Sequence, residues 1–216
     1  MTLRVDGLWR YPVKTLAGER LRATDLTFDG IPNDRIVHVR GPEGVRTSRR
    51  QRKLLGLQGS LGPDDQPLVN GHPWRNAEAL ALVKEAAGDD ASLAASDGLE
   101  RFDNLPLLIA TDGAVAAFGG DIRRLRPNIL IGGVDGMGEI DWPGGELHIG
   151  RAVIRLDSLR GRCPMTTVDP DTLVRDPGVL RDIGQRFHGK LALNAEVLRP
   201  GRLRVGDVVQ LVRATG

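Results

Sequence analysis

The chain has very little cysteine: Cys163 stands alone among 216 residues. One cysteine cannot form an intramolecular disulfide, a four-cysteine zinc site or an iron–sulfur cluster by itself. The histidines do not replace the missing ligands, because they lack the two-histidine helix spacing of a zinc site; they are His38, His72, His148 and His188. The composition therefore predicts a reducing, cytosolic environment and argues against zinc.

Long apolar runs and an excess of one charge are also lacking. No segment approaches the roughly 20 apolar residues that a membrane helix needs, and the first residues have no stretch of signal-peptide length. The 30 basic and 28 acidic residues give a net charge of +2, so the pI near 9.0 reflects a small imbalance. We expect neither a membrane anchor nor a general nucleic-acid-binding surface.

One basic cluster stands out, formed by Arg46, Arg49, Arg50, Arg52 and Lys53. Binding of nucleic acid would favour aromatic side chains between the cations, and this segment has none. The cluster is therefore interpreted either as a solvated loop or as a segment that faces a cofactor or docks an acidic partner.

Short stretches that alternate between apolar and polar residues occur along most of the chain, each ended by Gly, Pro or Asp. They predict a meander of strands in the first 41 residues, and a hairpin around Asn70-Gly71. Further strands are expected after residue 128, within residues 128–133, 146–150, 152–159, 195–201 and 202–212. Many short strands at close spacing favour a mainly β fold with a barrel and a few short helices, α+β overall.

Three segments are predicted to be helical: residues 77–87, 112–125 and 177–185. Asp112 is expected to cap the second of them. The small, polar residues 88–103 mark a change in composition that is typical of a boundary between two lobes. The sequence therefore predicts an N-terminal lobe of residues 1–95 and a second lobe of residues 96–216.

The most unusual local sequence is the loop Leu159–Asp171, LRGRCPMTTVDPD, which contains Cys163. Placing the thiol next to Arg162 favours the thiolate, the form that acts as nucleophile or soft-metal ligand. Two other interpretations stay open. Cys163 could be a small buried apolar residue, or it could serve a thiol hydrolase together with His188 or His148.

Five sequence blocks together resemble the MOSC family, which includes the C-terminal domain of molybdenum cofactor sulfurases and the mitochondrial amidoxime-reducing components. They are YPVKTLAGE, LRPNILIGG, WPGGELHIG, GRCPMTTVDPDT and PGRLRVGDVV, and they span Tyr11 to Val209 in the order of the family. The resemblance implies a MOSC β-barrel preceded by a smaller β-rich lobe, with a molybdenum–pterin cofactor between them. The family is also associated with pyridoxal phosphate binding.

The resemblance also implies which residues form the site. Cys163 would be the catalytic residue and the protein ligand to molybdenum. The other cofactor-binding positions would be Lys14, Thr15, Arg35, Thr111, Asp112, Arg126, Asn128, Gly161 and Arg162. These are the guanidinium, ammonium, hydroxyl and backbone donors that a phosphorylated pterin requires.

Two positions depart from the pattern of the family. Thr15 stands where relatives often have serine, and the residues around Asn194 are small and aliphatic where amidoxime-reducing relatives carry an aromatic residue. Outside the matched blocks, Asp169 and Asp171 are interpreted as turn residues that could also shape the substrate entrance. Arg123 and Arg124 could be ordinary cations of a last helical turn or ligand contacts.

By this resemblance the chain would be an oxidoreductase that reduces small N-hydroxylated or N-oxidised molecules. Because one cysteine cannot hold an iron–sulfur cluster, a separate ferredoxin-like or flavin protein would supply the electrons. The alternative is a sulfur carrier or cofactor-transfer module that uses a persulfide on Cys163. A third interpretation, a binding barrel with a lapsed site, leaves the charges of Lys14, Arg35 and Arg126 without a purpose.

Overall fold

The structure is a computed structural model that describes residues 2–96, 98 and 100–213. Its strands are β1 (Arg4–Arg10), β2 (Glu19–Leu21), β3 (Ala23–Leu26), β4 (Val37–Gly41), β5 (Gly44–Arg46), β6 (Gly59–Leu61), β7 (Pro67–Val69), β8 (His72–Pro73), β9 (Ser92–Ala95), β10 (Leu107–Thr111), β11 (Ile129–Gly132), β12 (Glu146–Ile149), β13 (Ala152–Gly161), β14 (Lys190–Arg199), β15 (Gly201–Arg204) and β16 (Gln210–Val212). The helices are α1 (Ala77–Ala87), α2 (Asp112–Phe118) and α3 (Pro177–Phe187), with short 3-10 turns η1 (Arg52–Gly56), η2 (Ile122–Arg124), η3 (Gly138–Asp141) and η4 (Pro164–Thr167).

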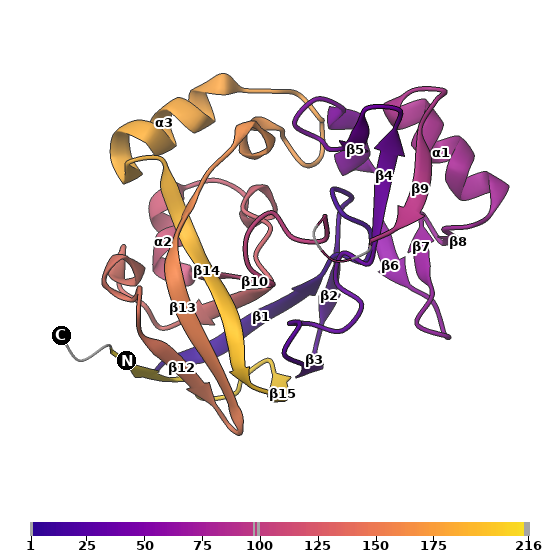
Figure 1. The fold of residues 1–216 in the computed structure, drawn as a ribbon. Helices are drawn as coiled ribbons and strands as arrows, with labels where there is room; N and C mark the ends of the chain where they lie inside the picture. The colour runs from indigo at the N-terminus through magenta and orange to yellow at the C-terminus, as the bar shows by residue number, and fades with distance from the viewer. Residues whose placement is uncertain (1, 97, 99, 214–216) are drawn as a thin grey trace.

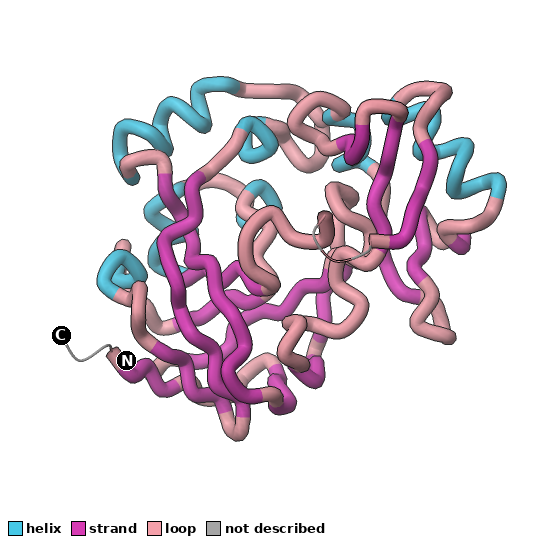
Figure 2. Tube along the Cα trace, in the orientation of Figure 1, coloured by secondary structure: helices cyan, strands magenta, loops and turns pink. Residues whose placement is uncertain are grey.

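The main sheet runs in the order β16-β12-β13-β14-β10-β11-β1-β2 (Figure 1). A bridge between Arg4 and Val208 also links the start of β1 to the residues just before β16. Because this bridge joins two distant strands of the sheet order, the sheet curls toward closure as a barrel. Strands predominate and helices are few and short (Figure 2), so the predicted mainly β, α+β class is confirmed.

The described residues form two large apolar cores and a smaller one, in which Phe118 of α2 packs near Phe187 of α3. The barrel core is built around fully buried aliphatic residues of the main sheet, among them Val5, Ile109 and Ile154. The N-terminal core lies under α1, where Val39 and Leu54 pack with Val83. In Figure 1 the β5-β4-β9 and β6-β7-β8 sheets and α1 form one side, and the main sheet forms the other.

The strands at the chain start do not form the expected meander. β1 pairs with β2 and with β11, whereas β3 pairs with β15, and β4 lies between β5 and β9. Strands β1 to β3 therefore pair, directly or through one another, with strands from residues 129–204. Strand β9, residues 92–95, pairs with β4 of the N-terminal core. The division at residue 95 stays a prediction, and the chain crosses between the two cores more than once.

Two of the three predicted helices form over the expected residues. Helix α1 spans Ala77–Ala87, and α3 begins at Pro177 behind the capping carboxylate of Asp176 but continues to Phe187. The predicted helix over residues 112–125 was wrong in its length. It ends at Phe118 because Gly119 adopts the left-handed conformation of a helix C-cap, with φ 70°.

Capping of that helix also differs from the prediction. Thr111, not Asp112, is the N-cap, and its hydroxyl oxygen accepts a hydrogen bond from the Ala114 amide at 3.2 Å. The expected hairpin around Asn70-Gly71 is confirmed, since β7 pairs with β8 and both turn residues have positive φ.

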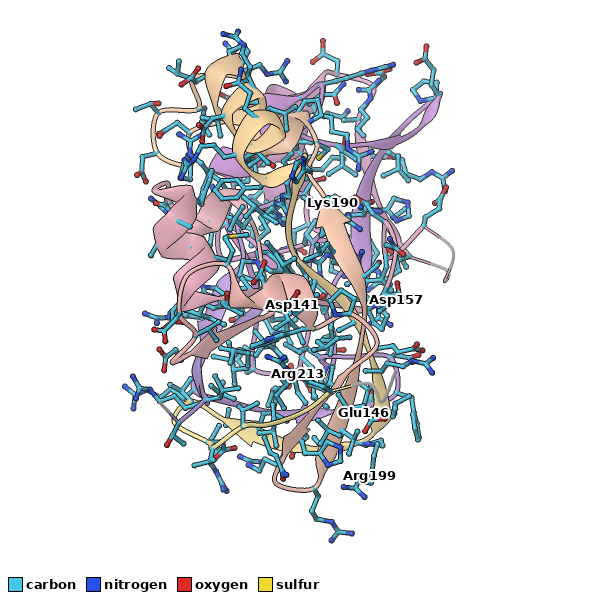
Figure 3. The ribbon with its side chains drawn as sticks, turned by 90° about the vertical axis from the view of Figure 1, so that its left-hand side faces the viewer. Asp141, Glu146, Asp157, Lys190, Arg199 and Arg213 are labelled. Atoms are coloured by element: carbon cyan, nitrogen blue, oxygen red, sulfur yellow. The ribbon has the colours of Figure 1, made fainter. Side chains whose placement is uncertain are left out.

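Acidic and basic side chains are interspersed on the face that Figure 3 shows. Going down that view, Lys190 is followed by Asp157 and Asp141, then Arg213, Glu146 and Arg199. This mixture agrees with a net charge close to zero. In the described part of the chain, no helix combines the length and the apolar character needed to cross a membrane.

Candidate functional site

A cavity of about 90 Å³ lies where the loops of the N-terminal core meet the barrel. Eight of the ten predicted cofactor-binding residues line it: Lys14, Thr15, Arg35, Arg126, Asn128, Gly161, Arg162 and Cys163. They come from segments as far apart in the sequence as Lys14 and Cys163. The fold therefore brings together most of the set that the resemblance implied.

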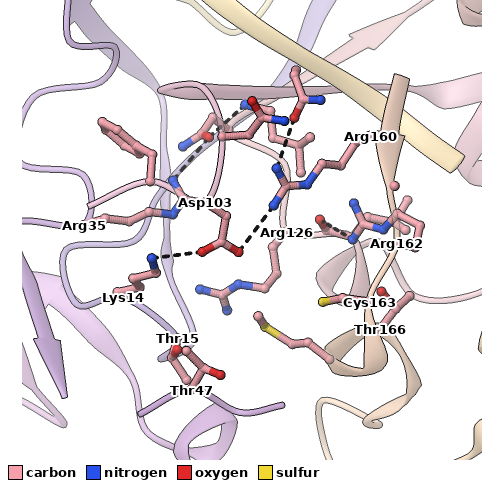
Figure 4. A pocket seen from close by; sticks show the side chains of 18 of the residues that line it. Lys14, Thr15, Arg35, Thr47, Asp103, Arg126, Arg160, Arg162, Cys163 and Thr166 are labelled. Atoms are coloured by element: carbon pink, nitrogen blue, oxygen red, sulfur yellow. Dashed lines mark hydrogen bonds and ion pairs between the residues drawn. The ribbon is translucent and has the colours of Figure 1, made fainter. Parts of the chain in front are cut away.

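The predicted loop presents Cys163 to this cavity. Strand β13 ends at Gly161, and the Arg162 amide donates to the Gly189 carbonyl at 2.8 Å, which fixes the start of the loop. Pro164 then begins the turn η4 with its fixed φ. Cys163 is a free cysteine of intermediate exposure, and its sulfur points into the cavity in Figure 4. A fully buried structural cysteine does not describe this position.

Arg49 of the basic cluster interacts with the thiol of Cys163. A hydrogen bond to Cys163 raises the pKa of Arg49, against the opposing effect of burial, and the charge of Asp103 adds to the rise. Arg46 has a different role, because its guanidinium pairs with Asp90 at 2.6 Å. The cluster thus divides: Arg49 faces the site, while Arg46 ties β5 to the turn after α1.

Arg126 and Arg162 are the most deeply placed cations of the cavity. Burial lowers the pKa of each to about 10, and neither has a carboxylate partner among the described ion pairs. The Arg126 guanidinium stacks on the Tyr11 ring at 4.3 Å, and burial raises the pKa of that phenol to about 12. Deep cations without a counter-charge are unfavourable unless an anion joins them.

Arg35 and Asn128 are held by structural bonds. Buried Asp34 pairs with the Arg35 guanidinium and accepts from the Tyr11 amide at 2.7 Å and from Asn128 Nδ2 at 3.2 Å. Asn128 Oδ1 also accepts from the Leu108 amide at 3.1 Å. These two predicted positions therefore have a structural reason to be polar, beside any contact with a ligand.

Three lining residues adopt a left-handed backbone that favours glycine. Thr15 has φ 85°, Arg35 φ 54° and Arg126 φ 56°. Such conformations are costly for residues with a Cβ, more so for β-branched Thr15, and they gather at functional sites. The fold accepts this strain at the positions where the resemblance places cofactor contacts.

Thr111 and Asp112 are not brought into the cavity. Thr111 is fully buried, and both its amide and its hydroxyl donate to Glu139 Oε2, at 3.1 and 2.8 Å. The Asp112 carboxylate accepts from the amides of Gly133 and Val134 at 2.8 and 2.9 Å. Their donors and acceptors serve the packing of α2 against the barrel.

The sequence analysis missed six polar or aromatic lining residues: Thr47, Phe102, Asp103, Asn104, Arg160 and Thr166. Asp103 pairs with Lys14 at 2.9 Å and with Arg160 at 3.3 Å (Figure 4). It also pairs with Arg49, at 2.8 Å. Thr166 lies in the loop Leu159–Asp171, three residues after Cys163, and could have been found there. The residues next to Asn194 are not aromatic, but Phe102 places an aromatic ring in the wall of the same cavity.

The turn prediction for Asp169 is confirmed. Its Oδ1 accepts from the amides of Asp171 and Thr172 at 3.1 and 2.9 Å, and its Oδ2 pairs with Arg124 at 2.8 Å. Asp171 instead pairs with Arg123 on the surface, at 2.7 Å. Arg124 lines the cavity and Arg123 does not.

Buried polar atoms with no partner among the described residues indicate that the cavity is built for a polar ligand. Arg162 Nε and Thr166 Oγ1 are both inaccessible to solvent and make no hydrogen bond there. Unpaired buried donors of this kind are rare unless a ligand or water satisfies them. The donor set suits an anionic, hydrogen-bonding group such as a phosphorylated pterin, and a thiol suits a soft metal.

A second cavity of about 200 Å³ adjoins the first, with Arg124, Arg126 and Met165 as shared walls. Sites for drug-sized ligands usually enclose about 300–1,000 Å³. Neither cavity alone reaches that size, so a cofactor of this kind requires side chains between or across the cavities to move.

Comparison with known proteins connects this site to a family. The model of the MOSC domain matches residues 112–210. Mitochondrial amidoxime-reducing component 1 from Homo sapiens is 31% identical over 96% of this chain and 82% of its own length. The protein of that name from Mus musculus is 28% identical over the same shares.

A solved structure supports the fold. The YUAD protein from Bacillus subtilis superposes with a TM-score of 0.55, at 13% identity, over 100% of this chain and 98% of its own. At this identity the likeness concerns the fold alone. The family match and the full-length relatives, together with a cavity that unites Cys163 with the matched cations, show that the chain belongs to the MOSC domain family.

Proposed function

We propose that this protein is a molybdenum-cofactor oxidoreductase that reduces small N-hydroxylated or N-oxidised molecules. The observation that carries the proposal is that one cavity brings Cys163 together with buried cations and with buried polar atoms that lack a partner among the described residues. The kinship to amidoxime-reducing components supports the substrate class. Reduction of an N–OH group breaks the N–O bond, consumes two electrons and two protons, and releases the oxygen as water.

Different residues of the cavity would hold the metal and the pterin. Cys163 would hold molybdenum through its sulfur, and the bound cofactor would supply the two-electron chemistry. Lys14, Arg49 and Arg160 would neutralise the phosphate, and Arg126 and Arg162 would add positive charge deeper in the cavity. Thr15 and Thr166 would donate or accept hydrogen bonds. Phe102 and Met165 offer apolar surface at the same cavity for an organic substrate.

Electrons would come from a separate ferredoxin-like or flavin protein, as the lone cysteine predicts. Arg50, Arg52 and Lys53 are exposed near Arg49 and would steer an acidic donor toward the site. The cytosolic location, the absence of nucleic-acid and membrane partners, and pyridoxal phosphate binding stay predictions.

Metal and pterin content tests the proposal most directly. Protein from a host that makes the cofactor should contain near-stoichiometric molybdenum and pterin. Cys163→Ala should lose the molybdenum and still fold, with a thermal midpoint close to that of cofactor-free wild type. Elemental analysis and the fluorescence of oxidised pterin measure both. Loaded wild-type protein should then reduce an aromatic amidoxime with a chemical electron donor.

Two lysine variants test whether the cations of the cavity bind the pterin, one in the cavity and one as a matched surface control. Lys14→Gln should lower pterin content at least tenfold, because Lys14 lies in the cavity with 14% of its side chain exposed. Lys53→Gln, at an exposed position in η1, should leave it unchanged. Absence of metal and pterin from properly supplied wild-type protein would refute the oxidoreductase, and sulfide release on reduction would then indicate a persulfide carrier.

A further inference from the structure

Three cations from distant segments converge on one carboxylate inside the cavity. Asp103 Oδ1 lies 2.9 Å from Lys14 Nζ, while Oδ2 lies 2.8 Å from Arg49 and 3.3 Å from Arg160. Lys14 follows β1, Arg49 precedes η1, and Arg160 is on β13. Figure 4 shows the carboxylate between Lys14 and Arg160, bridging the two sides of the cavity.

The charges around the cavity are strongly unequal. Lysine and arginine supply seven of its lining side chains, and Asp103 is the carboxylate among the lining residues that the structure describes. Cations gathered at partly buried positions repel one another unless an anion lies between them. Burial raises the pKa of Asp103, but the hydrogen bond and charge of Lys14, with Arg49 and Arg160, lower it below its ordinary value. Asp103 is thus held as an anion.

An incoming phosphate needs the same donors. A phosphate monoester carries close to two negative charges and three acceptor oxygens, so it binds these cations more tightly than a carboxylate does. It cannot share them with Asp103, because the two anions would repel.

We propose that Asp103 is the resident counter-anion of the cofactor cavity, and that an incoming phosphate monoester displaces it from Lys14, Arg49 and Arg160. The inference rests on the proposed cofactor function, since the phosphate concerned is that of the pterin. Asp103 keeps the three cations in place before loading and makes weakly charged anions poor competitors. It is a specificity residue that acts through the cations.

Phosphate binding by cofactor-free protein tests this without enzyme activity. In protein from a host that cannot make the pterin, Asp103→Asn should bind inorganic phosphate at least tenfold more tightly than wild type by calorimetry. Asp25→Asn is the matched control, because Asp25 pairs with Arg202 at 2.8 Å on the exposed β3–β15 pair. Its phosphate affinity should equal that of wild type.

Several outcomes would overturn the proposal. Unchanged or weaker phosphate binding by Asp103→Asn would show that Asp103 is a ligand contact or a structural residue. Failure of both proteins to bind phosphate would show that Lys14, Arg49 and Arg160 do not form a phosphate site. If the variant does not fold, a crystal structure of wild type with phosphate decides: the Asp103–Lys14 bond must open. The proposed function fails separately, on molybdenum and pterin content alone.

Discussion

Glu139 is a buried carboxylate without an ionic partner in the described part of the chain. Its two oxygens accept from the Thr111 amide and hydroxyl and from the Ala192 amide, the last at 2.7 Å. Ala192 has φ 68°, and it lies on β14 two residues after Lys190, the register partner of Gly161. Glu139 therefore supports the strand that faces the approach to the Cys163 loop.

The stability contributed by Glu139 should depend on pH. Burial raises the pKa of Glu139 above its ordinary value, against the lowering effect of its hydrogen bonds. A folded state that binds a proton more tightly than the unfolded state loses stability as pH rises through the raised pKa. Glu139→Gln should be about 1–3 kcal/mol less stable than wild type at acid pH, and this difference should shrink toward neutral pH.

Urea unfolding at several pH values measures that difference. The control is Glu196→Gln, because Glu196 pairs with Arg155 on the surface of the main sheet. A gap between Glu139→Gln and wild type that grows with pH would contradict the assignment of a raised pKa.

Glycines within helices show how elements constrain one another. A Cβ added at Gly113 in α2 would lie 2.2 and 2.3 Å from the carbonyl oxygens of Gly136 and Val134, whereas one at Gly184 in α3 would meet nothing within 4 Å. Gly113→Ala should therefore destabilise the fold by about 1–3 kcal/mol or more. Gly184→Ala should stabilise it by about 0.5–1 kcal/mol.

The pair is measured by chemical denaturation of both variants beside wild type. Both variants replace a helical glycine with alanine. Opposite changes in the free energy of unfolding would therefore be due to the close contact between α2 and residues 134–136. Equal changes in the two variants would show that this approach is not rigid.

Elements set by neighbouring residues could be predicted from the sequence, and elements set by distant pairing could not. Helix α1 and the Asn70-Gly71 hairpin follow from local periodicity and turn chemistry. The end of α2 at Gly119 was missed because the apolar spacing continues beyond it. The pairing of β3 with β15 joins residues far apart in the chain, which no local pattern encodes.

The site shows the same limit. Family blocks identified eight residues that the fold brings together, whereas Asp103 lies in a short polar stretch that resembles an ordinary linker. Its role depends on its ion pairs with Lys14, Arg49 and Arg160, which come from three other segments. Only the folded chain reveals that contact.

At the scale of the whole molecule, the cavity joins two apolar cores. Its walls come from residues 14–49 beside the N-terminal core and from residues 102–194 around the barrel. A ligand that binds only when both sides are in place stabilises the entire fold by mass action. Cofactor loading should therefore act as a clamp between the cores.

The clamp should be visible in thermal unfolding. A ligand at 100 times its Kd adds about 2.7 kcal/mol, and about 2–4 °C per kcal/mol is typical for chains of this length. Loaded wild type should melt roughly 5–10 °C above cofactor-free wild type. Cofactor-free Cys163→Ala should match cofactor-free wild type, and identical midpoints for loaded and free protein would refute the clamp.

The left-handed backbone at Thr15, Arg35 and Arg126 has a consequence for directed evolution. Glycine and asparagine adopt this conformation at lower cost than the residues present. A library selected for heat resistance alone should therefore replace Thr15 and Arg126 early, because each replacement relieves strain, whereas Arg35 should stay because it pairs with buried Asp34. The most heat-resistant clones would therefore be those that bind the cofactor weakly.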